Sequence, residues 1–257
     1  MRHVVLPDCQ VKPGIDCTYL KRIGTYIVEK KPEKIICLGD FADMASLSSY
    51  SKGKKSFEGQ RYVKDIEAAK SAMSLLLSPL QEYNAKAKKN KEKLYKPKLI
   101  LTLGNHENRI TRAVEDNAQL EGLISEKDLG YESFGWAVRP FLDVVIVDGI
   151  AYSHYFTSGL MGKPVTSAAA CLSKKHQSTI QGHQQGLQIA TSHRADGTRL
   201  TAVIAGSCYE NSEDYLGPQG NKHWRGFLVL HDIKPEGEFD LMPVSLDYMN
   251  KKYANIN

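Results

Sequence analysis

Residues of the types that can bind divalent metals follow several short apolar segments of this chain. Each stands at or just after the point where a predicted strand ends, in most cases behind a glycine or at an abrupt stop in the apolar pattern. They are Asp8, Asp40, Asn105, His106, His154 and His183. Side chains that directly follow rigid strands can converge on one point with little loss of conformational entropy. Carboxylate, amide and imidazole groups are common metal ligands. The pattern therefore predicts a metal centre, although a lone histidine would more often be a core residue.

The segment 98–107 (KLILTLGNHE) shows this arrangement most clearly. Its short Leu/Ile-rich run is typical of a strand that is covered on both faces. Gly104 permits a sharp exit. The amide, imidazole and carboxylate that follow then lie at the carboxyl end of the strand, where open α/β sheets place their sites. Taken alone, the Asn-His-Glu tripeptide fits an ordinary loop equally well. The residues at the other strand ends therefore decide whether this tripeptide belongs to a metal site.

The elements that position these side chains follow from periodicity and turn signals. Strands at 2–6 and 35–38 flank a helix at 15–31, which predicts a β-α-β unit. Two hairpins are expected across the Asp-Gly pairs at 148–149 and 196–197. The remaining expectations are helices at 62–83, 109–121 and 165–175, and strands at 98–103, 141–147, 150–154, 178–181, 187–192, 199–205, 227–232 and 239–244. An α/β fold of two sheets packed face to face with helices outside is predicted, as a single domain over 1–257.

Composition narrows the class of protein. The 257 residues are 42% hydrophobic, enough for a substantial core, and no apolar run approaches the length needed to cross a bilayer. The five cysteines are scattered without a C-x-x-C pair, and the chain begins directly in a strand without a secretory signal. Both features predict a cytoplasmic protein with reduced thiols and no membrane partner. The net charge of +5 permits an anionic substrate without requiring nucleic acid.

A helical, basic insertion is expected at about 45–98. It starts with a polar loop at 48–60 and continues as the helix at 62–83, in which Pro79 predicts a kink near the end. The basic segment 85–98 (AKAKKNKEKLYKPK) then has two interpretations. It is either a solvated helix end and linker, or a strip that contacts the phosphate backbone of nucleic acid.

The order of the polar blocks resembles the calcineurin-like metallophosphoesterases, a superfamily of metal-dependent phosphatases and nucleases. That family's pattern runs D-x-H, G-D-x-x-D, G-N-H-[ED], a lone histidine, then G-H-x-H. Here the blocks read DCQ at 8–10, GDFAD at 39–43, GNHE at 104–107, His154, and GHQQ at 182–185. The resemblance spans residues 2–205 and implies a four-layer αββα sandwich of two mixed β-sheets flanked by helices. Size and tail sequence are also similar to compact phosphoesterases encoded by bacteriophages.

The resemblance implies a complete second metal position. Asp40 would bridge two ions, and Asn105, His154 and His183 would complete the second one. Two imidazoles, an amide and a carboxylate suit Mn²⁺, Fe²⁺ or Zn²⁺.

The first metal position departs from the family. Asp8 would bind this ion together with Asp40, but the family's two other histidine ligands fall at Gln10 and Gln185. Glutamine ligates only through a neutral carbonyl oxygen, and an all-oxygen site suits Mn²⁺ or Mg²⁺ better than Zn²⁺. We expect Mn²⁺ as the cofactor, with Mg²⁺, Fe²⁺ and Zn²⁺ as alternatives. The protein holds either two ions, the first of them labile, or a single ion in the second position.

The resemblance also implies the catalytic groups. His106 would stay off the metals, stabilise the transferring phosphoryl group and protonate the leaving oxygen, and Asp43 would orient it. Two ions about 3.5–4 Å apart would clamp the phosphoryl oxygens and activate water. Glu107 and Arg109 are either charges at a helix start or substrate contacts.

Two aromatic residues are further candidates for substrate binding. Tyr155 either lines the cleft or packs in its wall. The polar, aromatic loop at about 206–226 either forms a wall that stacks Trp224 or Tyr209 on a base, or straps the late strands.

The predicted function is a metal-dependent phosphoester hydrolase. The main hypothesis is a phosphodiesterase or nuclease acting on DNA or RNA, because of the basic segment, the positive charge and the aromatic loop. The alternative is a phosphomonoesterase for small molecules or proteins, or a nucleotide phosphodiesterase, since no nucleic-acid module is recognisable. A third hypothesis is a non-catalytic binding scaffold with a weakened metal site. The sequence does not specify an oligomeric state.

Overall fold

A six-stranded mixed sheet forms the first half of the molecule. The computed structural model describes residues 1–50, 52–213 and 216–256, so residue 51 of the predicted 48–60 loop and residues 214–215 of the 206–226 loop lie outside the described part. The strand order is β13 (Asp240–Ser245), β12 (Gly226–His231), β1 (His3–Leu6), β2 (Lys34–Cys37), β3 (Lys98–Thr102) and β4 (Ala137–Arg139). Strands β1 to β4 are parallel, and β12 and β13 join antiparallel.

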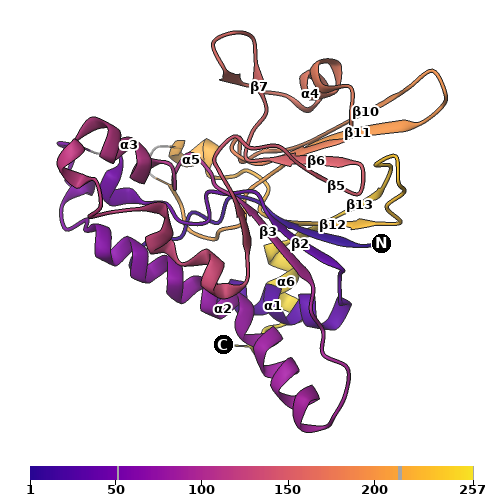
Figure 1. The fold of residues 1–257 in the computed structure, drawn as a ribbon, viewed down its shortest axis with the longest axis horizontal. Coiled ribbons are helices and arrows are strands. Elements are labelled where there is room, and N and C mark those ends of the chain that lie inside the picture. The colour runs from indigo at the N-terminus through magenta and orange to yellow at the C-terminus, as the bar shows by residue number, and fades with distance from the viewer. Residues whose placement is uncertain (51, 214–215, 257) are drawn as a thin grey trace.

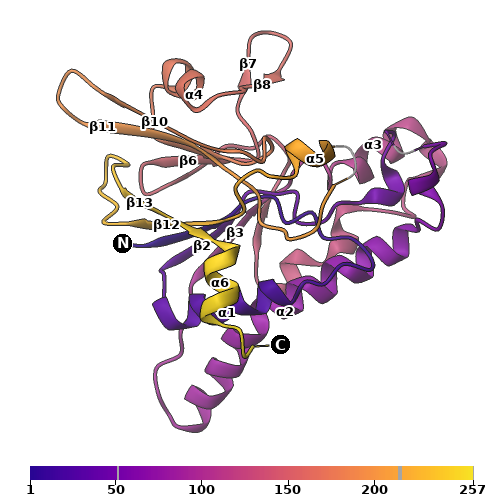
Figure 2. The ribbon, with the colours of Figure 1, turned by 180° about the vertical axis from the view of Figure 1, so that it is seen from behind.

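A second, five-stranded sheet lies above the first (Figures 1 and 2). Its order is β10 (Leu187–His193), β11 (Arg199–Ala205), β9 (Thr179–Gln181), β6 (Ile150–Ser153) and β5 (Val145–Val147). The three central strands are parallel, and both edge strands pair antiparallel. The two predicted Asp-Gly hairpins are therefore confirmed. A two-stranded ribbon, β7 (Thr157–Ser158) with β8 (Lys163–Pro164), projects beyond this sheet and was not expected from the sequence.

Helices cover both outer faces. Helices α1 (Thr18–Lys30), α2 (Tyr62–Lys89) and α6 (Leu246–Lys252) lie under the first sheet, and α4 (Ala168–Lys175) lies on the second (Figure 1). Strand side chains alternate between the resulting cores: Val4 packs in the core between the first sheet and its helices, and Val5 packs between the two sheets. A third core lies under α4. The predicted four-layer αββα sandwich is confirmed.

Several element boundaries differ from those predicted. Helix α3 (Arg109–Asp116) ends five residues before the predicted 121, because Asn117 adopts an extended conformation (φ −144°) and its side chain accepts a hydrogen bond from Gln119 N. Helix α2 continues past residue 83 to Lys89, with Pro79 inside it. Strand β4 and helix α6 were also missed. Among the described residues, no helix is both long and apolar enough to cross a membrane.

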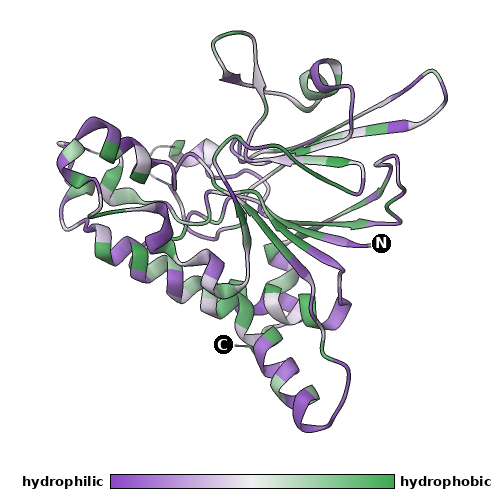
Figure 3. Cartoon of the chain, viewed as in Figure 1, coloured by the Kyte–Doolittle hydropathy of each residue, from purple (hydrophilic) through white to green (hydrophobic). Residues whose placement is uncertain are grey.

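The basic segment 85–98 lies far from the carboxyl ends of the parallel strands. Its first part forms the last turns of α2, and its remainder leads into the amino end of β3, at the bottom of Figure 1. Asn84 closes the turn by exchanging two hydrogen bonds with the backbone of Tyr95. This end of the molecule is strongly hydrophilic in Figure 3. The placement favours the solvated helix end and linker over a strip that contacts substrate.

Candidate metal centre

The predicted ligands meet where the carboxyl ends of the parallel strands of both sheets face each other. Helix α3 and the short α5 (Gly217–Gly220) lie near this end of the molecule (Figures 1 and 2). We call Asp40, Asn105, His154 and His183 the imidazole side, and Asp8, Gln10 and Gln185 the glutamine side.

The imidazole side is a tight cluster. One ligand atom from each of Asp40, His154 and His183 lies within 4.8 Å of the others. His154 Nε2 lies 3.4 Å from Asp40 Oδ2 and 2.8 Å from Asn105 Oδ1, while its Nδ1 lies 2.8 Å from the backbone oxygen of Leu38. Because a carbonyl only accepts, Nδ1 carries a proton and Nε2 points at the cluster, as second partners of metal-binding histidines usually ensure.

Two glycines make room for the carboxylates. A Cβ atom on Gly104 would lie 2.0 Å from Asp40 Oδ1, and one on Gly182 would lie 2.3 Å from Asp8 Oδ1. Any other residue would displace the carboxylate. Gly104 is therefore required by the close approach of two neighbouring strand ends of the first sheet, and Gly182 by the close approach of strand ends from the two sheets.

Left-handed backbone conformations occur on both sides of the centre. The φ angles of Asp40 and His183 are 48° and 70°, and those of Gln10 and Gln185 are 44° and 57°. Such conformations are costly for residues other than glycine and concentrate at functional sites. The glutamines thus occupy the same kind of backbone position as two of the ligands of the imidazole side.

Glu107 links the segments that follow β2 and β3 through hydrogen bonds. Its fully buried carboxylate accepts hydrogen bonds from the backbone N–H groups of Asp40 (2.9 Å), Ala42 (3.0 Å) and Gly104 (2.9 Å), and from the hydroxyl of Tyr131 (3.3 Å). Neither a charge at a helix start nor a substrate contact, the two roles considered from the sequence, describes this arrangement. The backbone N–H groups of Asp40 and Ala42 lie 67 and 65 residues away in the sequence, so no local pattern marks this role.

His106, Asp43 and Arg109 form a chain beside the cluster. His106 Nδ1 lies at ion-pair distance from Asp43 Oδ1, 2.8 Å, and Nε2 lies 3.6 Å from Asp40 Oδ2 and 3.0 Å from Arg109 Nη2. Arg109 also donates to the backbone oxygen of Asp43 at 2.7 Å. Because a guanidinium only donates, Nε2 accepts in this arrangement. A charged His106 would require Arg109 to turn away.

Burial and neighbouring charges shift the pKa values of the ionisable groups at the centre. Burial opposes ionisation of Asp40, but the charge and hydrogen bond of His154 and the backbone N–H of His106 outweigh it and hold the pKa of Asp40 well below its usual range. Burial also opposes a charge on His154, but Asp40 overcomes it and raises the pKa of His154 to about 9. Burial raises the pKa of Asp8 to about 7, with Asp40 adding to the rise, and lowers that of His183 to about 4.

This donor set fits a divalent cation. The His154 proton supplies positive charge to two buried carboxyl groups, and a divalent cation would supply it instead once the proton left. Carboxylate oxygen, imidazole nitrogen and amide oxygen on rigid exits are suitable ligands for Mn²⁺, Fe²⁺ or Zn²⁺. The residues that would hold the ion are those of the imidazole side.

The glutamine side is engaged with other parts of the chain. Asp8 accepts hydrogen bonds from the backbone N–H of His183 at 3.0 and 3.1 Å. Gln185 Oε1 accepts one from the hydroxyl of the fully buried Tyr209 at 2.7 Å. Gln10 is almost fully buried, and its N–H donates to the backbone oxygen of Asp40 at 2.8 Å. Asp8 and both glutamines thus lie beside the cluster. Tyr209, which belongs to the 206–226 loop, positions Gln185 through its hydroxyl group.

The two aromatic candidates differ in position. The Tyr155 ring packs against His183 and Phe141, with centroids 4.7 and 5.5 Å away, so it belongs to the wall of the centre. Trp224 lies partly buried against the core between the sheets, where Cβ atoms on Gly206 and Gly226 would come within 2.7 Å of its ring. The ring of Trp224 fills a slot between two glycines, which favours the role of a strap for the late strands, and its stacking on a base stays a prediction.

Comparison with known proteins adds little to this geometry. No family model matches the chain, and neither does any curated protein sequence. Among solved structures, it is similar to YfcE, a phosphoesterase from E. coli, over 96% of this chain and 100% of that chain, with 9% identity and a TM-score of 0.40. So slight a likeness assigns neither a family nor an activity.

Proposed function

We propose that this chain is a metal-dependent phosphoesterase with its centre at the imidazole side. The observation that carries the proposal is the convergence of Asp40, His154 and His183 within 4.8 Å, with His106 directly beside them. When bound there, a divalent cation would polarise phosphoryl oxygens and lower the pKa of water, so that no serine or cysteine nucleophile is needed. We propose Mn²⁺ as this ion.

His106 is the proton donor in this proposal. Water loses a proton to solvent and attacks phosphorus, the bond to the ester oxygen breaks, and that oxygen receives a proton from Nε2 of His106. Asp43 keeps the ring oriented through Nδ1. Arg109, which contacts Nε2, would turn toward the substrate phosphate and leave Nε2 free to carry its proton.

For the substrate we propose a phosphodiester of nucleic acid. Support comes from cationic side chains at the centre itself, since Arg109 and Arg112 both line a cavity next to Asn105. The basic segment 85–98 gives no such support, because it leads into the opposite end of β3.

The test is a panel of substrates with metal-loaded protein. Mn²⁺-loaded protein is assayed on a chromogenic phosphomonoester, a chromogenic phosphodiester, and single- and double-stranded DNA. His183→Ala is compared with His193→Ala, a matched histidine on the exposed strand β10. We expect cleavage of the diesters, abolished by His183→Ala and retained by His193→Ala.

Each other outcome has a definite meaning. Activity confined to the monoester would overturn the nucleic-acid substrate while preserving the phosphoesterase. Metal bound without hydrolysis of anything would favour a binding scaffold. Hydrolysis that survives His183→Ala would place the chemistry elsewhere.

A further inference from the structure

A cavity of about 360 Å³ opens directly beside the candidate metal centre, between residues 46–50, 52 and 57 on one side and helix α3 on the other. It shares two residues with the centre. Asn105 Oδ1 lies 2.8 Å from His154 Nε2, and the guanidinium of Arg109 contacts His106. The two sites are therefore contiguous, so that a substrate seated at the centre would extend into the cavity.

The cavity is predominantly cationic. Arg109 and Arg112 lie one turn apart on α3, a spacing that puts side chains about 5–6 Å apart at their Cβ atoms. Lys52 faces them from the loop, and Asp116 is the carboxylate among the lining residues. Guanidinium groups bind phosphate through paired N–H donors. The excess of cations over carboxylates favours an anionic occupant.

The two arginines have different surroundings. Arg109 is held by Asp43 and by the ring of His106. Arg112 is exposed, and within the described part of the chain its guanidinium has no ion pair or hydrogen bond. Arg109 thus sits at the boundary with the metal centre, whereas Arg112 is ready to bind a group farther along the substrate.

The opposite wall offers groups that suit a sugar or a base. Ser46, Ser48 and Ser49 line it, and hydroxyl and backbone groups of this kind commonly bind phosphate and sugar oxygens. Tyr50 is 80% exposed at the same wall. An exposed ring beside a cationic groove is a stacking surface for a base.

We infer that this cavity is a subsite for a second phosphate, next to the one that is hydrolysed, and that Arg112 is its principal ligand. The inference rests on the proposed function and gives it a specificity-determining residue. The substrate is then an ester with two neighbouring phosphates. Both a nucleic-acid strand and a small nucleotide with two phosphates have this chemistry.

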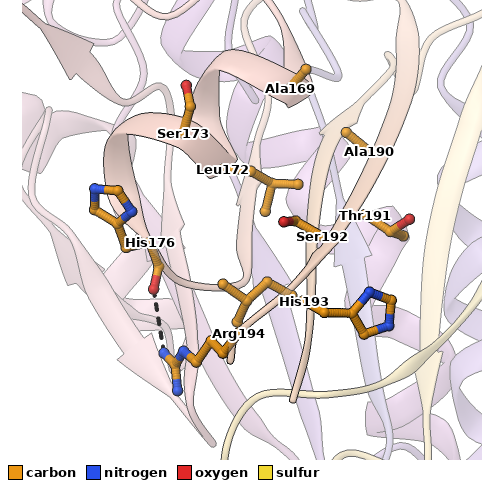
Figure 4. Close-up of a pocket in the computed structure, with 10 residues that line it drawn as sticks. Ala169, Leu172, Ser173, His176, Ala190, Thr191, Ser192, His193 and Arg194 are labelled. Atoms are coloured by element: carbon orange, nitrogen blue, oxygen red, sulfur yellow. Dashed lines mark hydrogen bonds between the residues drawn. The ribbon is translucent and has the colours of Figure 1, made fainter. Parts of the chain in front are cut away.

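A second cavity, of about 440 Å³, provides the control (Figure 4). It lies between α4 and β10, on the outer face of the second sheet, and none of the predicted ligands lines it. Arg194 lines it and donates to the backbone oxygen of His176 at 3.3 Å. Arg194→Ala therefore removes one exposed arginine without touching the proposed subsite.

The experiment measures binding by titration calorimetry. Thymidine 3′,5′-bisphosphate and thymidine 5′-monophosphate are titrated into wild type, Arg112→Ala and Arg194→Ala. Wild type should bind the bisphosphate about tenfold more tightly, the size of one charge-assisted contact at an exposed site. Arg112→Ala should lose this preference, Arg112→Lys should keep part of it, and Arg194→Ala should keep all of it. An undiminished preference in Arg112→Ala would overturn the subsite.

A second titration distinguishes the two sources of the second phosphate. A 5′-phosphorylated thymidine trinucleotide is compared with the bisphosphate. Greater dependence on Arg112 with the trinucleotide identifies a nucleic-acid strand, and greater dependence with the bisphosphate identifies a small nucleotide. Either result supports the subsite, and independence of Arg112 with both ligands overturns it.

The binding readout separates this inference from the proposed function. An Arg112-dependent preference in a protein that hydrolyses nothing would overturn the phosphoesterase alone. Hydrolysis without such a preference would overturn the subsite alone.

Discussion

The imidazole side and the glutamine side of the candidate metal centre have similar backbones and different ligands. On the imidazole side, a carboxylate and two imidazoles lie within 4.8 Å of one another. On the glutamine side, Asp8 is accompanied by two amides, one of which already accepts a hydrogen bond from Tyr209. Yet left-handed residues with φ between 44° and 70° occur on both sides.

This difference in ligands at similar backbones distinguishes two properties of a metal site, the placement of its ligand atoms and the strength with which they bind. The backbone determines where a ligand atom can be placed, and the side chain determines how strongly it binds. The glutamine side keeps the costly backbone at Gln10 and Gln185 but offers only neutral amide oxygens there, beside the carboxyl group of Asp8. We therefore expect a tightly held ion on the imidazole side and, at most, a weakly held one on the glutamine side.

The largest effect is expected from exchanging Asp40 for Asn. The change removes the carboxylate shared by the cluster, whereas Asp8→Asn affects only the glutamine side. Even a hydrogen-bond partner of a metal ligand is worth about 10- to 100-fold, so Asp40→Asn should lower kcat/KM by more than about a hundredfold. Metal content by mass spectrometry and diester hydrolysis measure the effect. An equal loss with Asp8→Asn would show that the two sides contribute equally.

Glu107→Gln should loosen the imidazole side by destabilising its strand exits. Glu107 Oε2 accepts N–H groups from both Asp40 and Gly104. The other carboxylate oxygen, Oε1, accepts from the backbone N–H of Ala42. In either orientation of a glutamine amide, its NH₂ group would therefore face at least one backbone N–H donor. A buried, unsatisfied arrangement of this kind costs about 2–3 kcal/mol of unfolding free energy, measurable by urea denaturation. Tyr131→Phe, which removes only one neutral donor, is the control and should cost about 1 kcal/mol.

Introducing histidine at both glutamine positions should give the glutamine side imidazole ligands like those of the imidazole side. Histidine tolerates the left-handed region better than most residues, so Gln10→His with Gln185→His fits the existing backbone. We expect affinity for a second Zn²⁺ to rise about tenfold or more, observed as a change from one to two bound ions in calorimetric titration. Unchanged stoichiometry would mean that the backbone on this side does not deliver ligands to a metal.

The smallest effect is expected from Tyr209→Phe. The hydroxyl of Tyr209 positions Gln185, and its removal costs about 1 kcal/mol at most. Binding of the weaker ion should fall by about threefold, while the tightly held ion on the imidazole side is unaffected. Comparable losses for both ions would indicate that the 206–226 loop supports the whole centre.

The sequence was most informative where polar residues follow strands. Alternation and glycine punctuation located Asp40, Asn105, His154 and His183, because the carboxyl ends of parallel strands meet at one edge of a sheet. The four layers follow from the same alternation. Boundaries were less predictable: the extended conformation of Asn117 ends α3 early, although the helical pattern continues past it.

Roles that depend on distant partners could not be read from the sequence. Glu107 binds backbone groups 65 and 67 residues away, and Trp224 fills a slot between two glycines. Arg112 gains its proposed role only because α3 turns it toward a loop of the insertion, which lies more than 50 residues earlier in the chain. In each case the deciding contact is tertiary.

The left-handed backbone at Gln10 and Gln185 also bears on how such a site changes during evolution. Glutamine and histidine codons differ only in their third base, so each position is a single nucleotide substitution away from an imidazole. Because the backbone already has a conformation that histidine tolerates, neither step requires the loops to refold. Metal stoichiometry in this fold is therefore open to change by point mutation.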